Sequence, residues 1–190
     1  MGSRYPRKYQ KSKCKLAKGA QLNPTSSQKT GLARSLLLCL LTTYIAFVFI
    51  QSLFYKFTDS PETQYIFGTL NSWGTSLGFP GLFDHHGIFS QYVVGTTELI
   101  ASSLLLFGLI RRHSLVQVAG ATLSVFVISG AIFFHLFTPL GISVLNADGT
   151  RDGGELFGLA CGVWLASIMI LFMNRLVISE FIARFFIKRK

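Results

Sequence analysis

Four long stretches almost free of charged side chains constrain this chain more than any other feature of its sequence. They run approximately over Ser35–Tyr55, Ile88–Ile110, Ser114–Phe137 and Leu156–Asn174, and Glu98 is the only Asp, Glu, Lys or Arg within them. About 20 apolar residues are what an α-helix needs to cross a bilayer. A buried helix of a soluble protein is usually shorter and keeps a polar face, which four such stretches in succession do not. With 50% hydrophobic and 14% charged residues, the chain is predicted to be an integral membrane protein with four transmembrane helices.

The basic residues predict how these helices are oriented. Nine of the 18 Lys and Arg residues lie between Arg4 and Arg34, two form the short turn Arg111–His113, and five follow the fourth span. Six of the eight acids fall in the connections on the opposite side. Because cytoplasmic flanks accumulate Lys and Arg, we expect both termini in the cytoplasm. Topology and attraction to anionic lipid headgroups account for the net charge of +10, so we expect membrane lipids as partners and no nucleic-acid binding.

Two further helices are predicted outside the spans. Ser60-Pro61-Glu62 is typical of an N-cap followed by a proline at the first helical position and an early acid. Aromatic and aliphatic residues then recur at helical spacing, which predicts an amphipathic helix at the exoplasmic interface. Apolar residues alternate with basic ones after Asn174 and predict an amphipathic helix at the opposite interface. The expected fold class is an all-α membrane protein: a four-transmembrane-helix bundle with an exoplasmic amphipathic helix between spans 1 and 2 and a C-terminal interfacial helix.

We divide the chain into a basic cytoplasmic N-terminal arm (residues 1–31), a transmembrane domain (32–177) and an amphipathic basic C-terminal tail (178–190). The arm has too few apolar residues to pack against itself, so it is expected to be disordered or held by a partner. The connection Thr138–Gly154, rich in Gly and Pro, is expected to be a compact exoplasmic loop.

Glu98 is the most informative single residue, because an unpaired carboxylate is costly within a bilayer. Gly95, Ala101 and Ser102 share its helical face and would allow close contact with another helix. Two interpretations remain open: a proton-carrying or ligand-binding acid, and a neutral, hydrogen-bonded packing residue.

Three more polar residues are expected near the exoplasmic ends of the spans: Lys56, His135 and Glu155. They are predicted to converge on one polar pocket, with Glu98 about ten residues deeper, or roughly 15 Å at the helical rise. The alternative is that Lys56 extends to the headgroups and Glu155 only stabilises the N-terminus of its helix.

Evidence for a metal or haem is weak. His85 and His86 follow Asp84 and are weak metal candidates, but adjacent residues rarely ligate one ion without a further ligand. The segment Asp148–Gly153 copies the start of a calcium loop, but Leu159 stands where a bidentate Glu is required. His135 is the only histidine within a span, so a bis-His haem site is not expected.

Several short motifs resemble the DoxX-like membrane proteins over about residues 36–174. They are Phe54-Tyr55-Lys56-Phe57-Thr58, Pro61-Glu62-Thr63, Gly95-x-x-Glu98-Leu99, Ser129-Gly130-Ala131-x-x-x-His135-Leu136 and Asp152-Gly153-Gly154. The resemblance implies a four-helix membrane bundle with Lys56, Glu98 and His135 as its polar positions. It also implies an association with redox systems, since family members include small subunits of a thiosulfate:quinone oxidoreductase and partners of oxidative-stress proteins.

The function expected first is that of a non-catalytic or accessory subunit, anchored in a bacterial inner membrane and associated with a redox or other membrane complex through its basic arm. The alternative is a binder or carrier of a small hydrophobic molecule, such as a quinone or a lipid, in a pocket around Glu98. An autonomous enzyme is least favoured, because the sequence has no nucleotide-binding loop, thiol pair or nucleophile–base signature.

Overall fold

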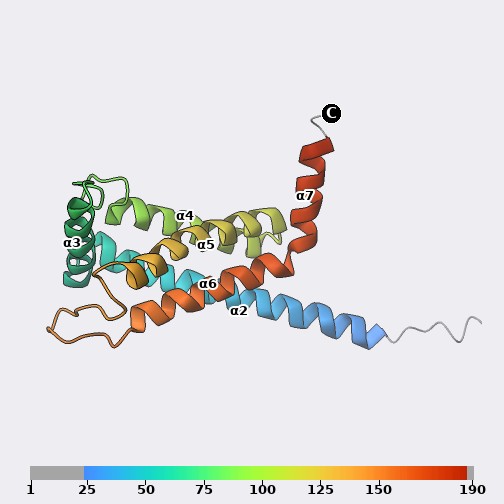
Figure 1. Ribbon diagram of the computed structural model, residues 1–190. Helices are drawn as coiled ribbons and strands as arrows, with labels where there is room; N and C mark the ends of the chain where they lie inside the picture. Colours follow the sequence, from blue (N-terminus) through green and yellow to red (C-terminus); the bar gives the residue numbers. More distant parts are fainter. Residues whose placement is uncertain (1–23, 188–190) are drawn as a thin grey trace, which may run out of the picture. The chain divides into compact units, whose positions relative to one another are not determined.

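The computed structural model describes residues 24–187, which hold six helices and no strand (Figure 1). Side chains are described for Lys29 and for residues 31–184. The helices are α2 (Pro24–Phe57), α3 (Pro61–Ser76), α4 (Gln91–Ile110), α5 (Ser114–Phe137), α6 (Glu155–Met173) and α7 (Arg175–Ile187). Four stretches are long and apolar enough to cross a membrane: Gly31–Phe57, Gln91–Ile110, Ser114–Phe137 and Glu155–Met173. The predicted fold class and the four predicted spans are confirmed.

The N-terminal end of α2 lies before the first predicted span. The helix already begins at Pro24, and its residues 24–37 are assigned to a different unit from the rest of the helix. Proline suits the start of a helix, because its missing N–H group would have no partner there. The arm was expected to be disordered or held by a partner; its residues 24–30 are helical, and residues 1–23 lie outside the described part.

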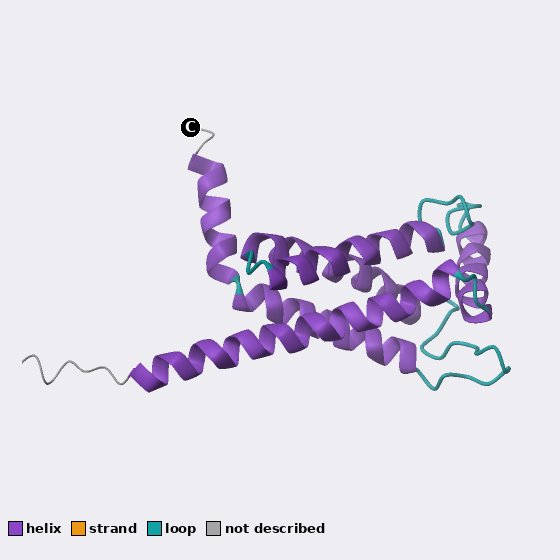
Figure 2. Ribbon diagram, turned by 180° about the vertical axis from the view of Figure 1, so that it is seen from behind, coloured by secondary structure: helices purple, strands orange, loops and turns teal. Residues whose placement is uncertain are grey.

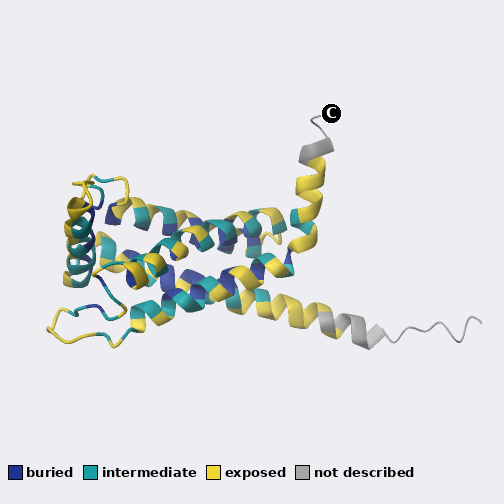
Figure 3. Ribbon diagram, viewed as in Figure 1, coloured by how far each residue is buried: buried dark blue, intermediate teal, exposed yellow. Residues whose placement is uncertain are grey.

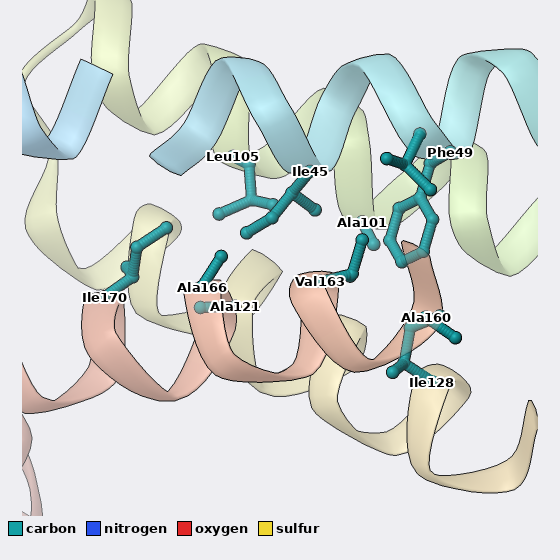
Figure 4. Close-up of a cluster of buried hydrophobic side chains, with 11 residues drawn as sticks. Ile45, Phe49, Ala101, Leu105, Ala121, Ile128, Ala160, Val163, Ala166 and Ile170 are labelled. Atoms are coloured by element: carbon teal, nitrogen blue, oxygen red, sulfur yellow. The ribbon is translucent and has the colours of Figure 1, made fainter. Parts of the chain in front are cut away.

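From Leu38 onward, α2, α4, α5 and α6 surround one apolar core, in which α5 packs against both α4 and α6. Figure 4 shows Ile45 and Phe49 of α2 among side chains from the other three helices. Four of the buried core residues are alanines, which let the helix backbones come close without a hydrophobic driving force between them. They are Ala101, Ala121, Ala160 and Ala166.

The backbones of α4 and α5 approach each other closely. A Cβ atom added to Gly108 would lie 2.6 Å from the backbone nitrogen of Gln117, and one added to Gly120 would lie 2.8 Å from the backbone nitrogen of Leu105. Since real Cβ atoms do not approach backbone atoms this closely, glycine is required at both positions for this packing.

Figure 3 shows exposed positions along the outward helix faces, and many of the exposed residues are large and apolar. Large side chains such as Phe47, Phe126, Leu165 and Phe172 are more than half exposed. The buried positions include polar residues such as Thr42, Gln117 and Ser124. This inverted distribution is what a lipid environment favours, because apolar side chains face the acyl chains and polar groups bond to one another inside.

One end of the bundle, called here the α3 end, is covered by α3 and by the loops 77–90 and 138–154 (Figure 2). Ser60 caps α3 as predicted, since its hydroxyl accepts a hydrogen bond from the backbone nitrogen of Thr63 at 3.3 Å. Leu70 of α3 packs with Phe83, Leu140 and Val144 of the loops in a second small core. Phe83 and Phe134 meet edge to face with ring centroids 5.2 Å apart. The cap thus packs α3 and the loop that follows it against the loop 138–154, which is distant from both in the sequence.

At the other end, α6 stops at Asn174 and α7 turns away from it (Figure 1). Asn174 is buried, and its side-chain amide donates a hydrogen bond to the carbonyl oxygen of Ile170. In α7, Leu176, Phe181 and Ile182 are exposed. The predicted tail is therefore helical up to Ile187, and its last three residues lie outside the described part.

Candidate functional site

A buried ion pair joins α2 to α4 near the α3 end. Lys56 Nζ lies 3.0 Å from both carboxylate oxygens of Glu98, and it also donates a hydrogen bond to Ser52 Oγ. The two charged side chains are only 14% and 6% exposed. Glu98 is therefore a charge-paired acid, and the idea that Lys56 extends away to the headgroups is wrong.

The direction of helical side chains explains this pair. Side chains in an α-helix lean toward the N-terminus of their own helix. Lys56 lies at the end of α2 and so leans back into the bundle, as its bond to Ser52 shows. Glu98 lies in the second turn of α4, whose first residue is Gln91, and leans toward the α3 end. The predicted depth of about 15 Å for Glu98 below Lys56 was wrong, because it counted residues along the helices and ignored these two opposed side-chain directions.

The helix face around Glu98 is packed as expected. Gly95, Ala101 and Ser102 are all buried, and a Cβ atom added to Gly95 would lie 3.4 Å from the Leu53 side chain and 3.5 Å from that of Lys56. The small residue at 95 thus lets α2 pass close enough for Lys56 to reach Glu98.

A cavity of about 250 Å³ opens beside the ion pair. Its lining comes from α2, α3, α4, α5, α6 and the loop 138–154, and it includes all four residues predicted from the sequence: Lys56, Glu98, His135 and Glu155. Apolar and aromatic side chains make up much of the remaining wall, among them Phe49, Ile66, Phe67, Ile128 and Leu159. The cavity therefore combines an apolar body with a few convergent polar groups, the usual composition of a small-molecule site.

His135, which lines the cavity, contacts the loop 138–154. Its Nδ1 atom lies 2.7 Å from the carbonyl oxygen of Gly141, and its ring meets the Phe157 ring edge to face at 5.7 Å. The residue is only 8% exposed. These contacts on two sides hold the imidazole in one orientation within the lining.

Glu155 and Asp152 stand at the start of α6. Glu155 is the first residue of the helix and is exposed, so its charge also lies where the helix dipole favours it. Asp152 bonds more extensively: its carboxylate accepts hydrogen bonds from the backbone N–H groups of Val144 at 2.7 Å, Gly154 at 3.0 Å and Leu156 at 3.1 Å. Burial alone would raise the pKa of Asp152, but these hydrogen bonds to its charged form outweigh burial and lower the pKa below the usual value.

Asp152 is the structural residue that sequence reasoning missed. From the sequence it was noted only in a failed match to a calcium loop and in the motif Asp152-Gly153-Gly154, although an Asp close before a helix is a signal for capping. Gly154 has a φ of 93° and offers no side chain to cap α6, and the Asp152 carboxylate supplies that function from two residues earlier.

Glu62 holds the same loop against α3. Its Oε1 atom accepts a hydrogen bond from the backbone nitrogen of Ala147 at 2.9 Å. The pKa of Glu62 is lowered chiefly by a hydrogen bond from its own backbone N–H group, with Ala147 adding to the effect against burial and the nearby charge of Asp148. Both Glu62 and Asp152 line the cavity, so the loop forms part of its wall.

The weak metal candidates lie elsewhere. His85 and His86 are exposed in the loop 77–90, and His85 lies beside the Tyr92 ring with centroids 5.9 Å apart. Among the residues that the structure describes, no group of three His, Cys, Asp or Glu side chains is placed to hold a metal ion.

The fold and the cavity define a four-span membrane bundle with a buried ion pair beneath a capped end. The DoxX family model matches residues 37–136, more than half of the chain, and the chain belongs to the DoxX family. The matched region includes Lys56, Glu98 and His135, whereas Asp152, Glu155 and α6 lie beyond it. Together with the four apolar helices, the family membership makes this a multi-pass integral membrane protein. No curated protein and no solved structure matches the chain.

Proposed function

We propose that this DoxX family protein binds a small hydrophobic molecule, a quinone or a lipid, in the cavity beside Lys56 and Glu98, and that it acts without catalysing a reaction itself. The observation that carries the proposal is the cavity of about 250 Å³ with a buried ion pair in its wall. Its volume is just below the usual range for small-molecule sites, about 300–1,000 Å³. It suits a single ring or the end of a lipid, with a longer apolar tail extending out between the helices.

The polar groups support binding because they fix an orientation. Lys56 and Glu98 lie at one part of the wall, and His135 lies on the facing helix α5. Phe49 and Phe67 supply aromatic surface against which a flat ring can pack.

The test is purification in a mild detergent followed by mass spectrometry of co-purifying quinones and lipids. In the variant Ala131→Phe, a larger side chain occupies the cavity that Ala131 lines, and we expect the bound molecule to be lost. The matched control is Leu136→Phe, because Leu136 lies on the same helix but is 49% exposed on its outer side. Equal amounts of bound molecule in both variants would contradict the proposal.

A second proposal is the accessory role, in which the protein is a subunit of a redox-associated membrane complex. Its support is the exposed apolar face of α7 next to basic residues, together with the basic arm, which contains Lys8, Lys11 and Lys13. The test is affinity purification of the native protein with stoichiometric analysis of its partners. Replacing these three lysines by glutamine should release the partner, whereas replacing them by arginine should not. Retention of a stoichiometric partner by the glutamine variant would refute a role for the arm.

We also propose that the protein resides in a bacterial inner membrane with both termini in the cytoplasm. The support is the separation of charge between the two ends: Arg111, Arg112 and Arg175 lie at the end opposite α3, and Glu62 and Asp84 lie at the α3 end. A reporter fused after Lys190 that is active only in the cytoplasm should be active, and the same reporter inserted after Gly149 should be inactive.

A further inference from the structure

The hydrogen bond of His135 determines which of its two ring nitrogens carries the proton and which can accept a hydrogen bond from a ligand. A carbonyl oxygen can only accept, so the 2.7 Å contact with Gly141 requires the proton on Nδ1. In the neutral ring, Nε2 then has no proton and accepts. Nε2 forms no hydrogen bond among the described residues, and His135 lines the cavity, so this nitrogen is available as an acceptor for a ligand.

Lys56 has no donor left for a ligand. An ammonium group has three N–H donors, and here two of them serve the Glu98 oxygens and the third serves Ser52. The strongest donor of the cavity is therefore fully used by the protein. Gln51 and Tyr55 also line the cavity, but their polar groups both donate and accept and do not select between ligands.

The charge of the cavity lining disfavours anionic ligands. The lining residues include one lysine and four carboxylates, those of Glu62, Glu98, Asp152 and Glu155. Among these, the Glu155 carboxylate accepts no hydrogen bond from the described part of the chain, and it adds an acceptor at the exposed edge of the cavity. An anionic headgroup would meet like charges at close range, which is unfavourable.

From these three observations we infer that the cavity selects a neutral ligand whose headgroup donates hydrogen bonds, namely an aromatic ring with hydroxyl groups such as a hydroquinone. A hydroquinone hydroxyl can donate to His135 Nε2 or to Glu155, whereas the oxygens of the corresponding quinone can only accept. An unpaired acceptor of this kind discriminates between ligands because it stays unsatisfied when the wrong one binds. This inference rests on the proposed binding function and narrows it to one redox form.

The test compares a short-chain hydroquinone, its quinone and an anionic phospholipid as ligands of the full-length protein in nanodiscs of neutral lipid. Anaerobic calorimetry should show that the hydroquinone binds at least roughly fivefold more tightly than the quinone, the effect of about one hydrogen bond. The anionic phospholipid should not compete with it.

The variant His135→Asn is the sharpest perturbation, because the asparagine amide can still donate to Gly141 while the Nε2 acceptor is lost. It should weaken hydroquinone binding more than quinone binding, so that the ratio of the two affinities falls roughly fivefold. His135→Gln, whose amide oxygen reaches the position of Nε2, should restore part of the preference. Nitrogen NMR of labelled wild-type protein should also find the His135 proton on Nδ1.

The outcomes separate the inference from the proposed function. Equal binding of both redox forms, with no effect of His135→Asn on their ratio, would overturn the preference and leave ligand binding intact. A failure of all three ligands to bind the wild-type protein would overturn the preference and the proposed function together.

Discussion

Removing one member of the Lys56–Glu98 pair should destabilise the protein more than removing both. Lys56→Met keeps the length of the side chain but deletes its charge, which leaves the Glu98 carboxylate, 6% exposed, without a counterion. At 3.0 Å and an effective dielectric constant of about 20, the attraction of the pair is about 5 kcal/mol. Desolvation of the two ions offsets much of this gain, so the pair as a whole contributes little, whereas a lone buried charge costs about 3–5 kcal/mol.

The measurement is the free energy of unfolding in mixed detergent micelles for a double-mutant cycle. We expect Lys56→Met to lose about 3 kcal/mol or more. Combining it with Glu98→Gln should recover at least about 2 kcal/mol relative to the sum of the two single losses. Additivity within about 0.5 kcal/mol would refute the reasoning, because it would mean that the two charges do not interact.

Substitutions at Glu98 alone provide a second check on the same pair. Glu98→Gln keeps an oxygen that accepts from Lys56, so the bundle should remain folded. Glu98→Lys places two ammonium groups at contact distance inside the bundle and should abolish folding. Equal thermal stability of these two variants in detergent would show that position 98 is not buried.

Three further predictions concern the helix ends and contacts. Asp152→Ala should reduce stability by about 1–2 kcal/mol at pH 7. Because the folded-state pKa of Asp152 is lowered, its contribution is present above the unfolded pKa near 3.8 and lost as the pH falls through the folded pKa, so denaturation of variant and wild type should converge in acid. Gly108→Ala should destabilise the α4–α5 contact by about 1–3 kcal/mol in thermal unfolding, whereas Gly158→Ala, whose added Cβ meets nothing within 4 Å, should be tolerated. Ser60→Ala should cost about 1 kcal/mol by removing the cap of α3, measured as a loss of protection from hydrogen exchange at Thr63.

Sequence reasoning located the elements because their signals are local. Hydrophobic length identified the four spans, and Ser60-Pro61-Glu62 identified the start of α3, which begins at Pro61. The polar cavity residues could be predicted for a related reason. An acid or a histidine within an apolar span almost always faces the interior of the bundle, because it is costly to expose to lipid.

The errors came from properties that depend on neighbouring helices. The atoms that Lys56 reaches depend on how α2 is rotated against α4 and on the absence of a side chain at Gly95. Neither property can be predicted from where a span begins and ends. On α6, Gly162 lies against the Tyr44 ring but Gly158 faces open space, because the spacing of small residues alone does not fix which side of a helix meets a neighbour. Asp152 was missed because its partners, Val144 and Leu156, are brought to it by the closure of the loop.

The position of the ion pair in the chain order bears on how the protein enters its membrane. Lys56 and Glu98 belong to the first and second spans, so both become available once the first helical hairpin has been synthesised. Their charges can neutralise each other at that stage, and the hairpin can move into lipid without carrying a lone ion. The third and fourth spans contain no Asp, Glu, Lys or Arg except Glu155 at the first residue of α6. Insertion of the third and fourth spans therefore needs no counterion. The ion pair of the interior lies between the two spans that are synthesised first.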